Sequence, residues 1–243
     1  MKLITTIFLL FVTLFTYGHS PIVKVGCSEK LTVYLYEDGT VKAASQQAYT
    51  PAQATFSIDS IQGVDGGQYV CVAWDSSGKV YELFAASGFA ESATMVGNDE
   101  DAQPFTDNRN VTCMYRAFIS IRGEDSTLWY WGIGDPLNLY AGATITAPVA
   151  LDMPSGGRKM KKILGVGNAG ISNGLTALYG LATDGTLWKW SRGTATPAQV
   201  TGMDTPILDF SCTGFYSVLA ATATKLYSFG MLDSRYSVAS SHS

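Results

Sequence analysis

The side chains that most often carry catalysis are scarce in the interior of this sequence. The chain has 243 residues and two histidines, His19 and His242, which lie close to its two ends. A Ser-His-Asp or Cys-His site needs an imidazole held in place by surrounding structure, and His-rich zinc sites need several. The sequence therefore predicts no imidazole chemistry, no metal site and no cofactor.

Carboxylates remain as candidates for catalysis, because a glycoside hydrolase needs only two or three of them. Among the acidic residues, Asp59 and Asp209 fall within stretches that are predicted as inner strands, and Asp65 follows one. Most other acidic residues fall in turns or in the run 98–101, which lacks the ligand spacing of a calcium loop. We expect a protein that is not an enzyme, with a carboxylate-dependent glycoside hydrolase as a minor alternative.

Aromatic residues beside charged ones are the best candidates for ligand binding. A sugar stacks its apolar face on an exposed ring while neighbouring polar groups satisfy its hydroxyls. Trp74 beside Asp75 and Tyr115 beside Arg116 have this arrangement and lie outside the regular aromatic spacing described next. These four residues are the predicted ligand-binding residues.

A strand, a turn and an aromatic strand recur five times and would position such residues. The copies span residues 31–41, 70–81, 118–132, 177–190 and 216–230. Turns such as Asp38-Gly39 and Asp184-Gly185 supply residues that tolerate positive φ between two strands. The aromatic residues that repeat in register are predicted to fill the space between units: Tyr81, Trp129, Trp131, Trp188, Trp190, Tyr227 and Phe229.

A short apolar run precedes each hairpin, and Pro-marked segments suited to outer strands follow several of them. Each unit thus has about four strands, and five units share the chain at about 45 residues each. We predict an all-β fold, a five-bladed β-propeller of four-stranded blades that forms a single domain over residues 19–243. A β-sandwich or a double barrel is the alternative.

The stretch 181–190 (LATDGTLWKW) and the run from Pro197 to Gly230 resemble repeats of the regulator-of-chromosome-condensation superfamily. In that family a Pro-x-x-Val outer strand leads to an inner strand, a second strand, an Asp-Gly turn and an aromatic-Gly end. The resemblance implies a propeller. The family's founding members have seven blades and act on a nuclear GTPase and chromatin, whereas this chain shows five units, so that activity is not carried over. Secreted propellers of the tectonin and tachylectin types are similar in architecture, and they bind sugars.

Residues 1–18 have the layout of a signal peptide, with Lys2, an apolar block and small residues before a cleavage site after Gly18. The predicted mature chain keeps 15 basic and 20 acidic residues, a net charge of −5. It carries no later apolar run long enough to span a membrane, and its negative charge does not favour phosphate backbones. We expect a secreted protein without nucleic-acid partners and without a membrane span.

Four cysteines in a secreted chain favour disulfides. From the alignment of the units in a closed ring, the hypothesis is Cys27–Cys212 and Cys71–Cys113, with free buried thiols as the alternative. Asn110 begins the sequon Asn-Val-Thr and is a candidate for glycosylation or for burial.

Together these features predict a binding protein. The leading expectation is a multivalent lectin whose partner is a carbohydrate or glycoprotein. The alternative is a structural or protein-interaction subunit of an extracellular assembly, which includes self-association.

Overall fold

The structure is a computed structural model. It describes residues 20–28, 31–45, 53–56, 58–67, 70–85, 91–114, 117–133, 135, 137–139, 143–166, 177–212, 217–230 and 240–242. The predicted signal peptide lies outside the described residues.

Within the described residues the chain forms 20 β-strands and no helix, and the strands make five four-stranded sheets. Sheet 1 contains β1 (Ile22–Cys27), β2 (Leu31–Tyr36), β3 (Val41–Ser45) and β4 (Gln53–Thr55). Sheet 2 contains β5 (Ile61–Gly66), β6 (Cys71–Asp75), β7 (Val80–Ala85) and β8 (Glu91–Met95). Sheet 3 contains β9 (Asn108–Met114), β10 (Ala117–Arg122), β11 (Thr127–Gly132) and β12 (Ile145–Ala150). Sheet 4 contains β13 (Met160–Val166), β14 (Ala177–Ala182), β15 (Leu187–Ser191) and β16 (Ala198–Gln199). Sheet 5 contains β17 (Asp209–Cys212), β18 (Ser217–Ala221), β19 (Leu226–Gly230) and β20 (Ser240–His242).

Each sheet is an antiparallel meander in which neighbouring strands in the chain pair with one another. The second and third strands of each sheet are the hairpins that the repeats predict, and the all-β class and the four-stranded unit are confirmed. As one would expect from such a chain, the described residues contain no helix that could cross a membrane.

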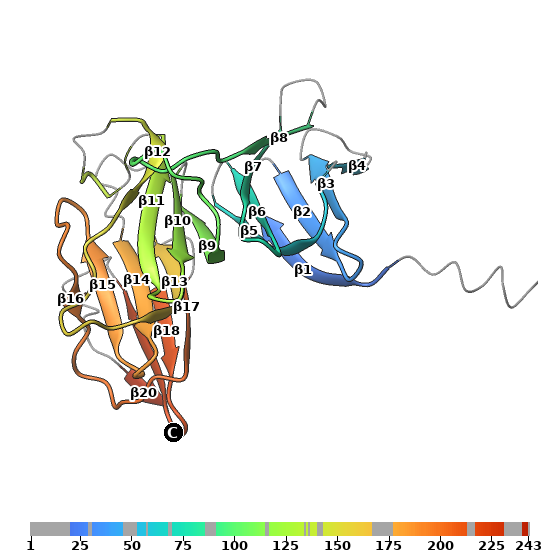
Figure 1. Ribbon diagram of the computed structural model, residues 1–243. Helices are drawn as coiled ribbons and strands as arrows, with labels where there is room; N and C mark the ends of the chain where they lie inside the picture. The colour runs from blue at the N-terminus through green and yellow to red at the C-terminus, as the bar shows by residue number, and fades with distance from the viewer. Residues whose placement is uncertain are drawn as a thin grey trace, which may run out of the picture.

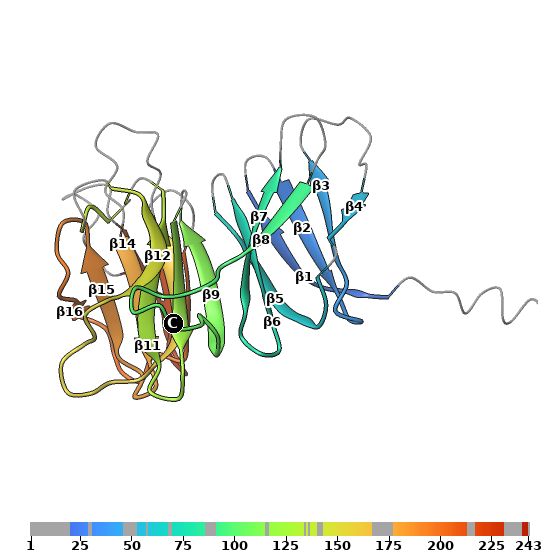
Figure 2. The same ribbon diagram turned by 45° about the horizontal axis from the view of Figure 1, so that its top comes forward.

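The five sheets follow one another in an arc, from sheet 1 in blue to sheet 5 in red (Figure 1). Four separate hydrophobic cores join consecutive sheets, one at each contact between neighbours. Figure 2, which turns the molecule by 45°, again shows sheet 1 at one end of this row, beside sheet 2. The arc is therefore held together by packing of one sheet face on the next.

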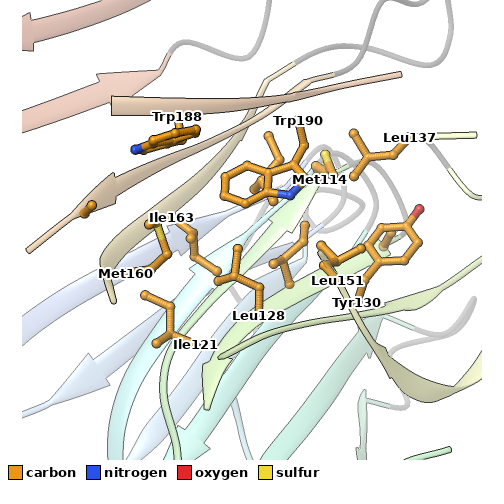
Figure 3. Close-up of a cluster of buried hydrophobic side chains, with 14 residues drawn as sticks. Met114, Ile121, Leu128, Tyr130, Leu137, Leu151, Met160, Ile163, Trp188 and Trp190 are labelled. Carbon is orange, nitrogen blue, oxygen red and sulfur yellow. The ribbon is translucent and has the colours of Figure 1, made fainter. Parts of the chain in front are cut away.

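The core between sheets 3 and 4 shows how these contacts are built (Figure 3). Ile121, Leu128 and Tyr130 come from sheet 3, and they pack against Trp188 and Trp190 of sheet 4. The prediction that repeated aromatic residues fill the space between units is confirmed for Trp131, Trp188, Trp190 and Tyr227, which are all buried.

The middle sheets and the end sheets differ in burial. Every residue of β6 and β14 is buried, because sheets 2 and 4 have a neighbour on both faces. In β18 of sheet 5, buried and exposed residues alternate, as in a strand covered on one face only. None of the four cores of the described residues joins sheet 5 to sheet 1, so the ring closure in our prediction is not present.

Gly185, in the turn between β14 and β15, lies against the chain that enters sheet 5. Its φ is +82°, and a β-carbon there would lie 2.4 Å from Cβ of Pro206. Its carbonyl accepts a hydrogen bond of 2.9 Å from the backbone N–H of Ile207. The Asp-Gly turn thus serves both the hairpin and the contact between two sheets.

Replacing Gly185 with alanine should lower the free energy of unfolding by about 3 kcal/mol, since left-handed strain adds to overpacking against Pro206. Gly193 is a matched control with φ of +74° and no atom within 4 Å of the added carbon. Gly193→Ala should cost about 1 kcal/mol, from strain alone. Urea unfolding measures both, and equal losses would show that the contact with the next sheet contributes nothing.

Candidate functional site

Trp74 does not have the exposed ring that its proposed role in sugar binding requires. Its side chain is only 5% exposed and belongs to the core between sheets 2 and 3. The ammonium of Lys24 lies 4.7 Å from the centre of its ring. The premise of the prediction is therefore wrong for Trp74, because the residue is part of the packing between sheets.

Asp75 is buried and anchors the turn that follows β6. Its Oδ1 accepts hydrogen bonds from the Ser77 N–H at 2.8 Å, the Ser77 hydroxyl at 2.7 Å and the Lys79 N–H at 3.0 Å. Its Oδ2 accepts a bond from the Tyr81 hydroxyl at 3.2 Å. With these four bonds made inside its own hairpin, Asp75 has a structural role in place of the predicted ligand contact.

The other two predicted ligand-binding residues, Tyr115 and Arg116, lie outside the described residues. The sequon is partly enclosed: the Thr112 hydroxyl donates a 2.7 Å hydrogen bond to Asp65, and Oδ1 of Asn110 is buried without a hydrogen-bond partner. Glycosylation of Asn110 stays a prediction.

All four cysteines are free thiols in this structure, so neither predicted disulfide is formed in it. The Cys27–Cys212 pairing depended on contact between the first and fifth units, which the described residues do not show. Cys113 and Cys71 are close enough to interact electrostatically. Burial raises the pKa of Cys71 to about 12 and the pKa of Cys113 well above its usual value.

The repeated turns hold a cation over an aromatic ring, a feature that sequence reasoning missed. In sheet 4 the Trp188 indole N–H donates to the Thr186 hydroxyl at 2.8 Å, and Thr186 in turn donates to Asp184 at 2.6 Å. The Arg158 guanidinium lies 5.1 Å from the Trp188 ring centre and forms a 2.9 Å ion pair with Asp184.

Sheet 3 repeats this arrangement. The Trp129 indole N–H donates to the Thr127 hydroxyl at 3.0 Å, and the Arg122 guanidinium lies 4.9 Å from the Trp129 ring centre. Arg122 also forms a 2.7 Å ion pair with Asp99. The spacing Asp-x-Thr-x-Trp in both hairpins was the signal available in the sequence. These ring faces are occupied by the protein's own cations and are not open platforms for a sugar.

Charged groups on the inner strands link neighbouring sheets. Asp65 of β5 accepts from the Thr112 hydroxyl and, at 3.1 Å, from the Cys113 backbone N–H, both on β9. Lys162 of β13 forms a 2.7 Å ion pair with Asp209 of β17. Two of the carboxylates considered for catalysis are thus engaged in contacts between sheets.

Their pKa values follow from these surroundings. Burial raises the pKa of Asp65, against the opposing effect of its hydrogen bonds. The hydrogen bond from Lys162 lowers the pKa of Asp209. Among the described residues, no three His, Cys, Asp or Glu side chains are grouped in a way that could hold a metal ion.

The hairpin-closing pairs reveal the surface that distinguishes the end sheets. In four sheets an apolar cross-strand pair at or near the turn lies on the face that packs on the following sheet, and these pairs are in buried cores: Leu35 with Val41, Trp74 with Val80, Ile121 with Leu128, and Leu181 with Leu187. In sheet 3 the pair Arg122 with Thr127 lies between this apolar pair and the turn. On the face of the fifth pair, Ala221 with Leu226 in sheet 5, none of the four cores of the described residues is found, and Leu226 is 41% exposed. The same register position is therefore core in four sheets and surface in the fifth.

Two sheet faces, one on sheet 5 and one on sheet 1, are left uncovered by the four cores of the described residues. The free face of sheet 5 carries Leu219, Ala221 and Leu226, and by the same pairing it also carries the polar residues Asp209, Ser211, Ser217 and Ser228. The free face of sheet 1 carries Ile22, Val25 and Tyr34. Four aliphatic side chains of these faces are between 39% and 50% exposed, while Val218, Ala220 and Tyr227 on the other face of sheet 5 are buried. These two faces hold half of the exposed large hydrophobic residues among the described residues.

Solved structures share this arrangement of sheets. Human WBSCR16 matches with a TM-score of 0.66 and 16% identity over 86% of this chain and 61% of its own. Yeast RCC1 (Prp20), solved bound to Kap60, matches with 0.64 and 13% over 86% and 56%. Prp20p from Saccharomyces cerevisiae, in a study of its binding to Gsp1p and histones, matches with 0.62 and 13% over 86% and 58%.

The chain has an RCC1-like β-propeller fold. At these identities the likeness concerns the fold alone, and the chain spans less than two thirds of the length of each of these structures. No family model matches the chain, and no curated protein does. The resemblance read from the repeats of sheets 4 and 5 is thereby confirmed at the level of fold.

The thiols should differ in reactivity. With iodoacetamide at neutral pH, exposed Cys27 should react in the native protein, whereas Cys71 and Cys113 should react only after denaturation, because burial disfavours their thiolates. Peptide mass mapping measures this. If Cys71 and Cys113 stay unmodified in denaturant until a reductant is added, the disulfide predicted from the sequence is present after all.

The role of Asp75 predicts a pH dependence. Burial alone would raise its pKa, but the bonds from Ser77, Lys79 and Tyr81 together lower the pKa below 3.8. The stability it contributes is therefore present above pH 3.8 and lost as the pH falls through its folded-state pKa. Asp75→Asn should cost about 2 kcal/mol at neutral pH and flatten the acid limb of the stability profile. Exposed Asp101→Asn is the control, and identical profiles for both variants would contradict the anchoring role.

Proposed function

We propose that this chain is a protein-interaction module of the β-propeller class. The observation that carries the proposal is the group of exposed aliphatic residues on the free faces of the two end sheets: Ile22 and Val25 on sheet 1, and Leu219 and Leu226 on sheet 5. Contiguous exposed apolar surface on a folded domain marks a contact with another macromolecule, because leaving it in water is unfavourable. Flat aliphatic faces suit the side chains of a protein partner better than the hydroxyls of a sugar.

The aromatic residues support a protein partner over a carbohydrate. Trp74 is buried, Trp129 and Trp188 are covered by arginines, and Lys42 lies 5.0 Å from the ring centre of Tyr36. A lectin needs open ring faces next to free polar groups. The described rings named here do not offer them, which favours the protein-interaction alternative over the lectin.

The solved structures add a precedent for protein partners. Yeast Prp20 is solved with Kap60 and studied for binding to Gsp1p and histones. These partners belong to the yeast protein, because the identity is low and the sequence of residues 1–18 predicts a secreted chain. With that signal peptide, the proposal is an extracellular interaction subunit without catalytic activity.

A photo-crosslinking amino acid placed at position 219 or 226 tests the proposal in extract from the native source. Both positions are on the free face of sheet 5, and we expect covalent adducts to protein. Position 95 is the control, since Met95 is 52% exposed on the outer strand of sheet 2, and it should give none. A glycan array run in parallel should be negative. Specific glycan binding with no protein adduct at 219 or 226 would reject the proposal in favour of the lectin.

A further inference from the structure

The free face of sheet 5 and the free face of sheet 1 correspond to the two surfaces that meet wherever consecutive sheets pack in this chain. In each of the four cores, the face that carries a hairpin-closing pair packs on the opposite face of the next sheet. Sheet 5 has the first half uncovered, with Leu226 in the closing pair, and sheet 1 has the second half uncovered, with Val25 opposite Tyr34. The face that would cover sheet 5 is thus of the kind that sheet 1 leaves uncovered, and the reverse also holds.

The register shows how far sheet 5 follows its neighbour. In sheet 4, Tyr179, Leu181 and Leu187 lie on the face toward sheet 5 and are all buried. By the pairing of their hairpins, the equivalent residues of sheet 5 are Leu219, Ala221 and Leu226. A terminal unit that ends a repeat array carries a polar outer face. Sheet 5 keeps apolar residues at these three positions, next to the polar Asp209, Ser211, Ser217 and Ser228 of the same face.

The two ends of one chain are not in a position to cover each other. The four cores of the described residues join sheets 1 and 2, 2 and 3, 3 and 4, and 4 and 5, and none of them joins sheet 5 to sheet 1. In Figure 1, sheet 1 lies at the right of the molecule beside sheet 2, and sheet 5 lies at the lower left beside sheet 4.

We infer that a second copy of this chain supplies the missing half, with the free face of sheet 1 packing on the free face of sheet 5 of its neighbour. This inference rests on the proposed function and names the partner. The contact between two copies would repeat the packing of consecutive sheets, because the equivalent faces meet in each of the four cores within the chain.

The contact joins two different surfaces, so it is heterologous. Each added copy leaves one free face of each kind, and the assembly grows as a chain of molecules or closes into a ring. In a heterologous contact, unlike a symmetric dimer, a variant damaged on sheet 5 and a variant damaged on sheet 1 can still bind each other. The intact sheet 1 face of the first then packs on the intact sheet 5 face of the second.

Sedimentation velocity over a range of concentrations tests the inference on the full mature chain. The sheet 5 variant is Leu219→Glu with Leu226→Glu, and the sheet 1 variant is Ile22→Glu with Val25→Glu. Met95→Glu with Ile133→Glu is the matched control, since Met95 and Ile133 are similarly exposed but lie off both faces. All these positions are exposed, and far-ultraviolet circular dichroism verifies that each variant is folded.

The wild type and the control should form species larger than a monomer, with mass that rises with concentration. Each face variant alone should be monomeric, and an equimolar mixture of the two should form a species of two chains. A monomeric wild type, a face variant that assembles like the wild type, or a mixture that stays monomeric would overturn the inference.

The photo-crosslinking experiment distinguishes failure of the self-association inference from failure of the proposed protein-interaction function. Adducts from positions 219 and 226 to a different protein, with a monomeric wild type, reject the second copy and keep the interaction role. Absence of any protein adduct together with a monomeric wild type rejects both.

Discussion

Packing of one apolar sheet face on another is the constraint on which this structure depends. A four-stranded sheet with two apolar faces is stable in water only when both are covered, at roughly 25 cal/mol for each Å² of apolar surface removed from solvent. Sheets 2, 3 and 4 meet this condition, and their second strands are buried at almost every position. The hairpin turns, the buried tryptophans and the links between inner strands all serve to bring these faces together.

The local part of the fold could be predicted from sequence because it is set by near neighbours in the chain. Asp184-Gly185 specifies a turn through backbone conformation, and the aromatic residue after it falls at a fixed register position. The prediction for Trp74 is wrong because it relied on a near neighbour in the chain. Adjacent Asp75 suggests a surface position, whereas Trp74 pairs with Val80 and both residues lie in the core between sheets 2 and 3. What decides its burial is the presence of sheet 3, which lies more than 30 residues further on. Ring closure is a sum of small angles between sheets, and no residue pattern in the chain encodes it.

Arginine side chains cover the faces of Trp129 and Trp188 next to the turns, so these rings have a protein contact without a ligand. Arg122 contacts a ring, a carboxylate and two backbone carbonyls. A planar guanidinium can make all these contacts at once, which an ammonium cannot. Arg122 and Trp129 belong to one hairpin, but Asp99 comes from a segment more than 20 residues earlier, so the spacing of Asp125, Thr127 and Trp129 indicates only part of the group.

The end sheets follow from the same constraint as the middle ones. With one face covered, sheets 1 and 5 have fewer buried contacts to hold their strands, so local opening there costs less free energy than in sheets 2, 3 and 4. A partner that covers the free face of sheet 5 binds only while β17, β18 and β19 are formed, and it therefore stabilises that sheet by mass action. Association and local folding are coupled at this end of the arc. Leu219 and Leu226 leave apolar surface in water in the isolated chain, and a partner that covered them would add buried contacts to sheet 5.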